Sequence, residues 1–351
     1  MVGPDPNGMG GISNVVRTMQ KSSFFSKFKI EYLPTVSDFC RNKLTFLLKS
    51  FVKFFFSCSL NCRGVYIHTA SNRSFYRKCL FILVSCLYSK KIILHIHPSF
   101  FFLFITKFNK TQKVFFYFLL NKVATFIVLT HEMKRSLKTI LPNKTIVVLR
   151  NPIDIEKMEN KRGIIRENNR LLYLGWYVRE KGIFDLVDAF NILIQEKNEL
   201  FLDFYGTKEI KKLQSYVNLK GLSAKISVNG WIDDLEKIDA FYRSTMLILP
   251  SYSEGVPNVI LEAMATHTPI VATSVGGLKE ILSDGNNAMI AKAGDPKNLS
   301  RKILILFMNE GLRKQISFNA FQKVKKEFEV SLIKKKFNQI LNETFACNQK
   351  S

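Results

Sequence analysis

The sequence predicts an α/β fold with two doubly wound, Rossmann-like domains, each a parallel sheet between layers of helices. Short apolar runs alternate with longer helical patterns along most of the chain, which is typical of βαβ units. The runs are apolar on both faces, as in parallel strands that helices cover on both sides. The 351 residues, of which 47% are hydrophobic, suffice for two cores and exclude a disordered chain.

The predicted strands fall into two groups. The first group is 64–69, 91–97, 124–130 and 145–150, and the second is 170–175, 200–206, 225–230, 246–251 and 269–274. A polar run between the groups (150–169) contains Asn151-Pro152, which interrupts regular structure and indicates a linker. We therefore predict an N-terminal domain over 1–150, a second domain over 151–325, and a C-terminal helix and tail over 326–351 that could cross back to the first domain.

The chain begins with MVGPDPNGMGGIS, in which a glycine-rich loop leads into a helix. A doubly wound domain has a strand before such a loop, and only Met1 and Val2 precede this one. The sequence therefore predicts a truncated first strand.

Charge is distributed unevenly. The net charge is +24, and residues 1–150 hold 23 Lys/Arg against 4 Asp/Glu, whereas the remainder holds 29 against 24. A basic N-terminal half indicates a polyanionic partner, either nucleic acid or an anionic membrane surface, unless it only reflects biased composition. Basic residues are dispersed and no nucleic-acid recognition motif is present, so we expect the membrane surface and no nucleic acid.

Two stretches, 43–60 and 100–120, mix Phe and Leu with Lys every few residues. Neither is apolar enough to span a bilayer. On a helix this pattern is typical of an interfacial segment with snorkelling lysines, or of a core helix with solvated lysines. The six cysteines form no CxxC pair, and we expect free thiols.

The segment EGVPNVILE (254–262) carries two carboxylates at the ends of an apolar stretch. It follows a predicted strand, and Pro257 suits the first position of a helix. Glu254 then lies in the loop and Glu262 about two turns into the helix. We expect them to contact different parts of one extended ligand. Alternatively, Glu254 stabilises the helix dipole and Glu262 is a solvated helix residue.

Three predicted strand-to-helix junctions are suited to phosphate groups, because helix N-termini offer unpaired N–H groups. They are the helix after Glu254, the glycine-rich turn at 8–13, and the turn that contains Gly276-Gly277. One such turn is weak evidence for a ligand, whereas three in one chain indicate a phosphate-containing ligand.

The segment LPSYSEGVPNVILEAMATHTPIVATSVGGLKEIL (249–282) resembles the donor-binding signature of retaining family 4 glycosyltransferases, also called glycosyl transferases group 1. These enzymes have the GT-B fold, two Rossmann-like domains facing across a cleft. Further pieces agree in the same order: GGIS near the start, LHIHPSFF (94–101), VLRNPID (148–154), LGWYVREKGIFDLVDAF (174–190) and VNGWIDDLEKIDAFYRS (228–244). The resemblance covers nearly the whole chain.

The resemblance implies roles for individual residues. Glu254 would contact the donor sugar and position the reacting centre, and Glu262 would bind the ribose hydroxyls. Lys181 would neutralise the diphosphate in place of a metal ion. Trp231 would shape the base pocket, or is a buried aromatic residue. The remaining donor-binding set implied by the resemblance is Gly11, Gly175, Arg179, Pro257, and the backbone N–H groups of Val256, Asn258, Gly276 and Gly277.

His95 and His97 share one face of a predicted strand. A metal site would need a third ligand, and the sequence points to none, so we expect no metal and no cofactor. The resemblance places a catalytic histidine at the end of this strand, near the reacting sugar, which favours His97, whereas His95 is interpreted as a core residue. His68, His131 and His267 show no comparable signal.

The chain departs from the family pattern at Trp176, where an arginine is usual, and at His267, where a glycine is usual. The first departure removes a cation from the expected diphosphate site, unless Arg179 replaces it.

We therefore expect a retaining, metal-independent glycosyltransferase of the hexosyltransferase type, moving a sugar from a nucleotide-diphosphate sugar to a lipid-linked saccharide acceptor. The expected setting is bacterial surface polysaccharide assembly (the O-antigen of lipopolysaccharide, capsule or exopolysaccharide) in the cytoplasm, peripheral on the inner face of the plasma membrane. Alternatives are a GT-B nucleotide-sugar epimerase, a basic nucleic-acid-binding protein and a non-catalytic paralogue.

Overall fold

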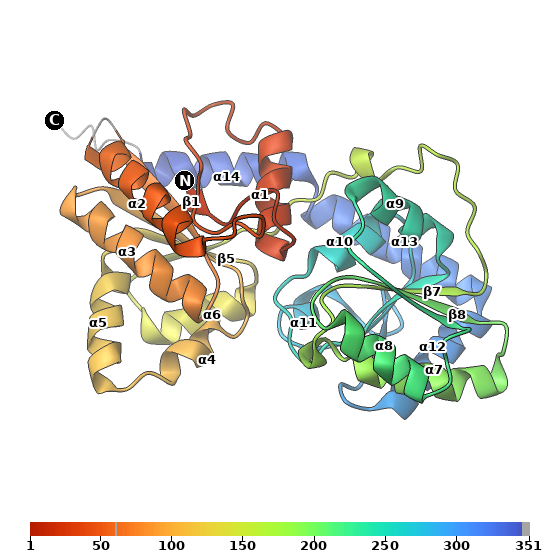
Figure 1. The fold of residues 1–351 in the computed structure, drawn as a ribbon. Helices are drawn as coiled ribbons and strands as arrows, with labels where there is room; N and C mark the ends of the chain where they lie inside the picture. Colours follow the sequence, from red (N-terminus) through yellow and green to blue (C-terminus); the bar gives the residue numbers. More distant parts are fainter. Residues whose placement is uncertain (60–61, 346–351) are drawn as a thin grey trace. The chain divides into compact units, whose positions relative to one another are not determined.

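The computed structural model describes residues 1–59 and 62–345. The chain divides into two compact units, here called unit 1 (Met1–Pro152 with Val330–Ser351) and unit 2 (Ile153–Glu329). The sequence placed the boundaries after residues 150 and 325, and the structure places them after Pro152 and Glu329. The end of the chain thus belongs to the same unit as its beginning (Figure 1).

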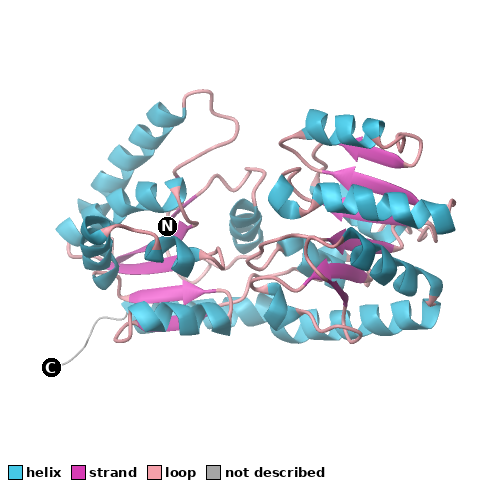
Figure 2. Cartoon of the chain, turned by 90° about the horizontal axis from the view of Figure 1, so that it is seen from below, coloured by secondary structure: helices cyan, strands magenta, loops and turns pink. Residues whose placement is uncertain are grey.

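Unit 1 is a parallel sheet with helices on both faces (Figure 2). The strand order is β2-β1-β3-β4-β5-β6. The strands are β1 (Val2–Gly3), β2 (Leu33–Pro34), β3 (Gly64–Thr69), β4 (Lys91–Ile96), β5 (Thr125–Val128) and β6 (Thr145–Val148). The helices are α1 (Gly11–Lys21), α2 (Lys43–Ser59), α3 (Arg73–Leu87), α4 (Phe101–Thr106), α5 (Lys110–Asn121), α6 (His131–Ile140) and α14 (Val330–Phe345).

Strand β1 is short but lies inside the sheet. Val2 pairs with Leu33 of β2 and with Ile67 of β3. At Gly3 an added Cβ would lie 2.1 Å from the hydroxyl of Tyr32, so a side chain at this position would require the Tyr32 ring to move. The first strand is thus as short as predicted but consists of Val2 and Gly3, and the glycine-rich loop that follows leads into α1.

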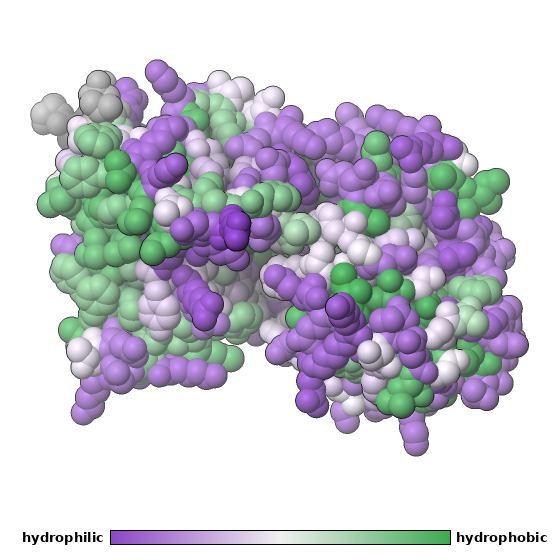
Figure 3. Space-filling view, viewed as in Figure 1, coloured by the Kyte–Doolittle hydropathy of each residue, from purple (hydrophilic) through white to green (hydrophobic). Residues whose placement is uncertain are grey.

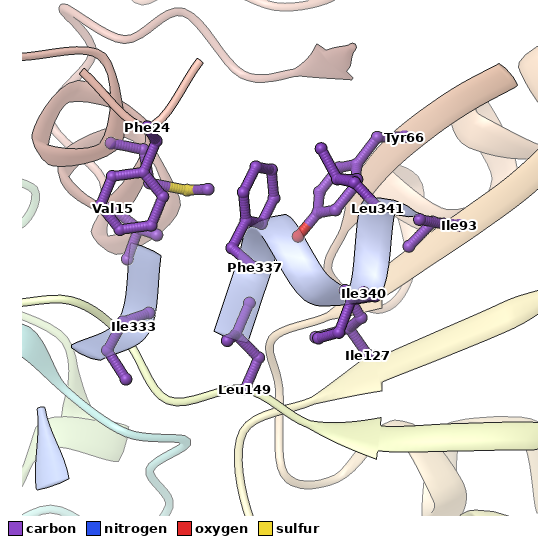
Figure 4. Packing of buried hydrophobic residues seen from close by; sticks show 11 residues of the cluster. Val15, Phe24, Tyr66, Ile93, Ile127, Leu149, Ile333, Phe337, Ile340 and Leu341 are labelled. Atoms are coloured by element: carbon purple, nitrogen blue, oxygen red, sulfur yellow. The ribbon is translucent and has the colours of Figure 1, made fainter. Parts of the chain in front are cut away.

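The core of unit 1 is completed by α14. Figure 4 shows Phe337 of this helix among apolar side chains from α1, from strands β3, β4 and β5, and from Phe24 and Leu149, which follow α1 and β6. The buried residues of this cluster are Val15, Met19, Phe24, Tyr66, Ile93, Ile127, Leu149, Ile333, Phe337, Ile340 and Leu341. Because α14 is joined to unit 2 in sequence and packs in unit 1, unit 1 is built from both ends of the chain.

Unit 2 has a parallel sheet of order β12-β11-β10-β7-β8-β9. The strands are β7 (Arg170–Leu174), β8 (Phe201–Tyr205), β9 (Ile226–Asn229), β10 (Met246–Leu249), β11 (Ile270–Thr273) and β12 (Met289–Ala291). The α-helices are α7 (Ile183–Glu196), α8 (Ile210–Leu219), α9 (Asp234–Arg243), α10 (Asn258–Ala265), α11 (Leu278–Ile281), α12 (Pro296–Met308) and α13 (Glu310–Glu327), with 3-10 helices η1 (Glu156–Met158) and η2 (Arg179–Lys181).

Three predictions about local structure need correction. Strands β2 and β12 were not predicted, because they have only two and three residues. The stretch 100–120 is two helices, since Asn109 and Gln112 form a capping box that starts α5. Pro257 is the N-cap residue of α10, which begins at Asn258. Among the described residues, no helix combines the length and apolarity needed to cross a membrane.

Candidate active site

Glu254 lies in the loop between β10 and α10, at the carboxyl end of the unit 2 sheet, where ligands of doubly wound folds bind. It is only 6% exposed. Its Oε1 accepts hydrogen bonds from Lys181 Nζ at 2.6 Å and from Ser251 Oγ at 2.7 Å. A buried carboxylate is costly unless it is paired, and the lysine provides the compensating charge.

Gly182 allows η2 to approach the loop that follows β10. Gly182 follows η2 with φ +68°, and an added Cβ would lie 2.1 Å from the carbonyl oxygen of Pro250. The loop after β10 is also tied to η2 by the Tyr252 N–H, which donates to the Glu180 carbonyl at 2.9 Å. The Lys181–Glu254 pair therefore depends on a glycine at a position where a side chain does not fit.

Glu262 lies in α10 and is 4% exposed. Lys237 of α9 donates to its Oε1 at 2.7 Å. The alternative of a solvated helix residue is therefore wrong for Glu262. Each of the two glutamates is paired with a different lysine. Sequence analysis missed Lys237, since nothing in the spacing links residues 25 apart on separate helices.

The Gly276-Gly277 turn is tied to the same loop. Gly277 N–H donates to the backbone carbonyl of Glu254 at 3.1 Å. This amide is engaged within the protein, which corrects the expectation that it faces a ligand. Gly276 has φ +50°, and α11 after it is a single turn of four residues. The turn therefore fixes the Glu254 loop.

The other expected donor residues lie at strand ends and loop starts of unit 2. Gly175 follows β7, and its N–H donates to the Tyr205 carbonyl at 3.0 Å. Arg179 is exposed in η2, beside Lys181. Val256 is buried, and Asn258 is the first residue of α10. In unit 1, Gly11 is exposed as the first residue of α1.

Two tryptophans are exposed at the carboxyl edge of the unit 2 sheet. Trp231, two residues after β9, is 48% exposed, so the alternative of a buried aromatic residue is wrong. Trp176 is 40% exposed, and Lys208 Nζ lies 4.9 Å from its ring centroid. Lys208 has φ +92°, a conformation that costs a non-glycine residue about 1–3 kcal/mol. A strained lysine therefore holds a positive charge beside the tryptophan that replaces the expected arginine.

In unit 1, His97 lies just after β4 and is 8% exposed. Its Nε2 is 3.0 Å from Nδ1 of His68, and Tyr66 bonds to Nδ1 of His95 at 2.8 Å. Burial lowers the pKa of His97 to about 3 and the pKa values of His68 and His95 well below the usual range. All three imidazoles are therefore neutral near pH 7. The third histidine that sequence analysis did not find beside His95 and His97 is His68.

Unit 1 also carries a surface here called the apolar face, which runs across α2, α3 and α5 (Figure 3). α3 packs against both α2 and α5. The exposed side chains are Leu44, Leu48, Val52, Phe55 and Phe56 on α2, Tyr76, Leu80, Leu83 and Leu87 on α3, and Val114, Phe115 and Phe118 on α5. Contiguous apolar surface of this kind marks an interaction site in soluble proteins.

Comparison with known proteins identifies the family. The profile described as Glycosyl transferases group 1 matches residues 154–323, which is most of unit 2. An uncharacterized glycosyltransferase of Methanocaldococcus jannaschii is 32% identical over 257 residues, covering 73% of this chain and 70% of that protein. The chain belongs to the glycosyl transferases group 1 family. The predicted family membership is thus confirmed, and the protein is a glycosyltransferase.

Other relatives of this group 1 glycosyltransferase include the capsular polysaccharide biosynthesis glycosyltransferase CapM of Staphylococcus aureus, 25% identical over 252 residues and covering 66% of each chain. Among solved structures, sucrose-phosphate synthase from Thermosynechococcus elongatus aligns with a TM-score of 0.80 at 16% identity, covering 99% of both chains. Anabaena HepE in complex with UDP and glucose aligns at 0.77 and 17% identity, covering 97% of this chain and 99% of that one. These likenesses show the fold, and the predicted GT-B fold class is confirmed.

Proposed function

We propose that this group 1 glycosyltransferase transfers a sugar, with retention at the anomeric carbon, from a nucleotide-diphosphate sugar to a lipid-linked saccharide at an anionic membrane surface. The setting we propose is bacterial surface polysaccharide assembly, in which the O-antigen of lipopolysaccharide, capsule and exopolysaccharide are the candidate products. The contact that supports the donor half most directly is the 2.6 Å ion pair of Lys181 with buried Glu254. It places a cation that a diphosphate can recruit next to a carboxylate that a sugar hydroxyl can engage.

In the proposed reaction, the bond between the anomeric carbon and the leaving phosphate oxygen breaks as an acceptor oxygen attacks on the same face. The acceptor proton passes to the leaving phosphate oxygen, so no protein nucleophile is needed. Lys181 Nζ stabilises the charge that develops on the diphosphate, in a site where fixed charges act strongly. Glu254 accepts hydrogen bonds from the donor sugar, Glu262 binds the ribose hydroxyls, and neutral His97 hydrogen-bonds the sugar.

We further propose that side chains alone neutralise the diphosphate. Three cations support this: Lys181 and Arg179 in η2, and Lys208 above Trp176. Lys208 follows β8 and Trp176 follows β7, and these strands are neighbours in the sheet. In this proposal Lys208 supplies the positive charge that is missing because Trp176 stands where the family usually has an arginine.

The membrane half of the proposal is supported by the apolar face and its charge. No aspartate or glutamate occurs between Asp38 and Glu132, a stretch that includes α2, α3 and α5. Lysines such as Lys49 and Lys113 lie on the same helices as the exposed leucines and phenylalanines. Apolar side chains that enter the headgroup layer and lysines that meet anionic lipids act together in interfacial binding.

The donor half is tested by thermal shift with UDP-, GDP-, ADP- and dTDP-sugars. One nucleotide class should raise the melting temperature, and Glu262→Ala should abolish the shift. Exposed Glu180→Gln, in η2, should leave it unchanged. Absence of any shift with all four classes contradicts the donor site. A free-sugar product without an acceptor would instead favour a nucleotide-sugar epimerase.

The membrane half is tested by co-sedimentation with vesicles. We expect binding to phosphatidylglycerol vesicles and little binding to phosphatidylcholine vesicles. Leu48→Asp on the apolar face should reduce it, while Leu219→Asp, on a 79% exposed leucine of unit 2, should not. Equal loss in both variants, or no binding by the unaltered protein, would contradict the proposed surface.

A further inference from the structure

Three buried histidines converge in unit 1. His68 of β3 and His95 of β4 are directly paired in the sheet register, and His97 lies two residues beyond His95. Since side chains alternate along a strand, all three point to the same face of the sheet. One ring nitrogen from each lies within 4.8 Å of those of the other two. The rings of His95 and His97 stack with centroids 4.1 Å apart.

The cluster is not satisfied by hydrogen bonds within the described protein. Nε2 of His68 and Nε2 of His95 are buried, and neither has a hydrogen-bond partner among the described residues. His68 and His95 are 1% and 2% exposed. An unpartnered buried polar atom costs about 1–3 kcal/mol, so two in one cluster indicate that something else completes them.

We propose that His68, His95 and His97 bind one divalent transition-metal ion of the Zn²⁺ class, with water as a fourth ligand. Three neutral imidazoles and a water are a known tetrahedral zinc set, whereas Mg²⁺ and Ca²⁺ prefer oxygen ligands that this cluster lacks. This site lies within unit 1 and is distinct from the lysines proposed to neutralise the diphosphate.

The surrounding contacts suit such a site. Tyr66 hydrogen-bonds to Nδ1 of His95 and belongs to the core cluster around Phe337. The His95 ring is therefore fixed, and its Nε2 remains for a ligand. Metal-ligating histidines generally have the second nitrogen held in this way. Tetrahedral zinc places ligand nitrogens roughly 3.3 Å apart. Small rotations of the rings would reach this spacing, and the bond between His68 and His97 would be exchanged for metal ligation.

The proposed metal site predicts an effect on activity, and this prediction rests on the proposed function. His97 is the residue proposed to hydrogen-bond the reacting sugar, and a metal ion would occupy one of its two ring nitrogens and restrict the ring. The metal-loaded enzyme should therefore be less active, and a chelator should restore activity. Metal binding itself is measured without any substrate, so failure of the donor proposal would not be confused with failure of this one.

The experiment uses the full chain after treatment with EDTA and desalting. Zn²⁺ is added, excess is removed, and the metal retained is measured by elemental analysis; one ion per chain is expected. Co²⁺ should give the visible absorption of a four-coordinate site. His68→Gln and His95→Gln should each weaken binding at least tenfold, whereas His131→Gln and His267→Gln should not.

A second measurement needs no variant and guards against misfolding of the histidine substitutions. X-ray absorption at the zinc edge of the unaltered protein should show three imidazole ligands and no sulfur. Retention of no metal, sulfur ligation from cysteines such as Cys58 and Cys62, or full binding in the folded His68→Gln and His95→Gln variants would each overturn the proposal.

Discussion

The two units bury polar groups in opposite ways. In unit 2 the buried carboxylates are paired with cations: Asp203 with Arg170, Glu254 with Lys181, and Glu262 with Lys237. In unit 1 the buried groups are histidines and Lys78, whose Nζ is held by the Thr35 hydroxyl. Unit 2 therefore holds cations in place with buried carboxylates. Unit 1 offers neutral nitrogen atoms and no buried acid in the described residues.

The surfaces differ as well. Between Asp38 and Glu132 unit 1 has no acidic residue, whereas unit 2 has acidic and basic residues paired at its surface, such as Lys302 and Asp284. The family profile matches most of unit 2 and none of residues 1–153. The segment that matches the family profile is therefore in unit 2, whereas the surface without acidic residues is in unit 1.

The largest expected effect on activity is at Glu254, in the ion pair with Lys181. We expect Glu254→Gln to lower kcat by about 10²–10³-fold, the usual loss when one group that stabilises the transition state is removed. Steady-state kinetics with the donor identified by thermal shift measures the effect. Glu180→Gln is the matched control, since Glu180 is exposed in η2. Near-normal turnover by a folded Glu254→Gln protein would make the ion pair structural.

The second test concerns Lys237. Removing one partner of a buried ion pair costs about 3–5 kcal/mol, because the other charge is left uncompensated. Lys237→Met should therefore lower the free energy of unfolding and raise the donor KM more than it lowers kcat. The double variant Lys237→Met/Glu262→Leu should recover stability without recovering donor affinity. If donor affinity also recovers, Glu262 does not bind the ribose.

A smaller effect is expected for membrane binding, where the surfaces of unit 1 and unit 2 should differ. One lysine near an anionic membrane contributes about 1 kcal/mol, or roughly fivefold in binding. Lys113→Gln on α5 should weaken association with phosphatidylglycerol vesicles by this factor, and raised salt should reduce the difference. Lys211→Gln on α8 of unit 2 is the control. Equal effects of the two substitutions would show that only net charge matters.

The smallest expected effect is at Lys208. Lys208→Gly relieves the backbone strain at φ +92° and should raise stability by about 1 kcal/mol. The same change removes a cation and should raise the donor KM by a few fold. Thermal melts and kinetics on one preparation measure both. A donor KM that stays unchanged would remove Lys208 from the diphosphate site.

The sequence was most informative where strands are long and signatures are local. The nine predicted strands all occur, since each is an apolar run that a turn or a glycine ends. Strand β2 could not be found in this way, because Leu33–Pro34 is too short to show a period and contains proline. The break before α5 had a signal that was overlooked: Asn109 and Gln112 have the spacing of a capping box.

The site was predictable to the extent that it is encoded in one segment. Glu254, Glu262 and Lys181 were found because the signature and the REKG turn are contiguous. Lys237 and His68 were missed because their partners are distant in sequence: Lys237 meets Glu262 through helix packing, and His68 meets His95 through strand register. Such partners follow from tertiary structure, which local patterns do not specify.

The return of α14 to unit 1 has a consequence for how the protein is made. Unit 2 is one continuous segment, and its residues have all been synthesised before α14 is translated. Unit 1 lacks Phe337 and its neighbours until then, so the core around Tyr66 and Ile93 stays open during most of translation. A released chain that ends at Glu329 should therefore contain a protease-resistant unit 2 after an N-terminal segment that proteases still cut.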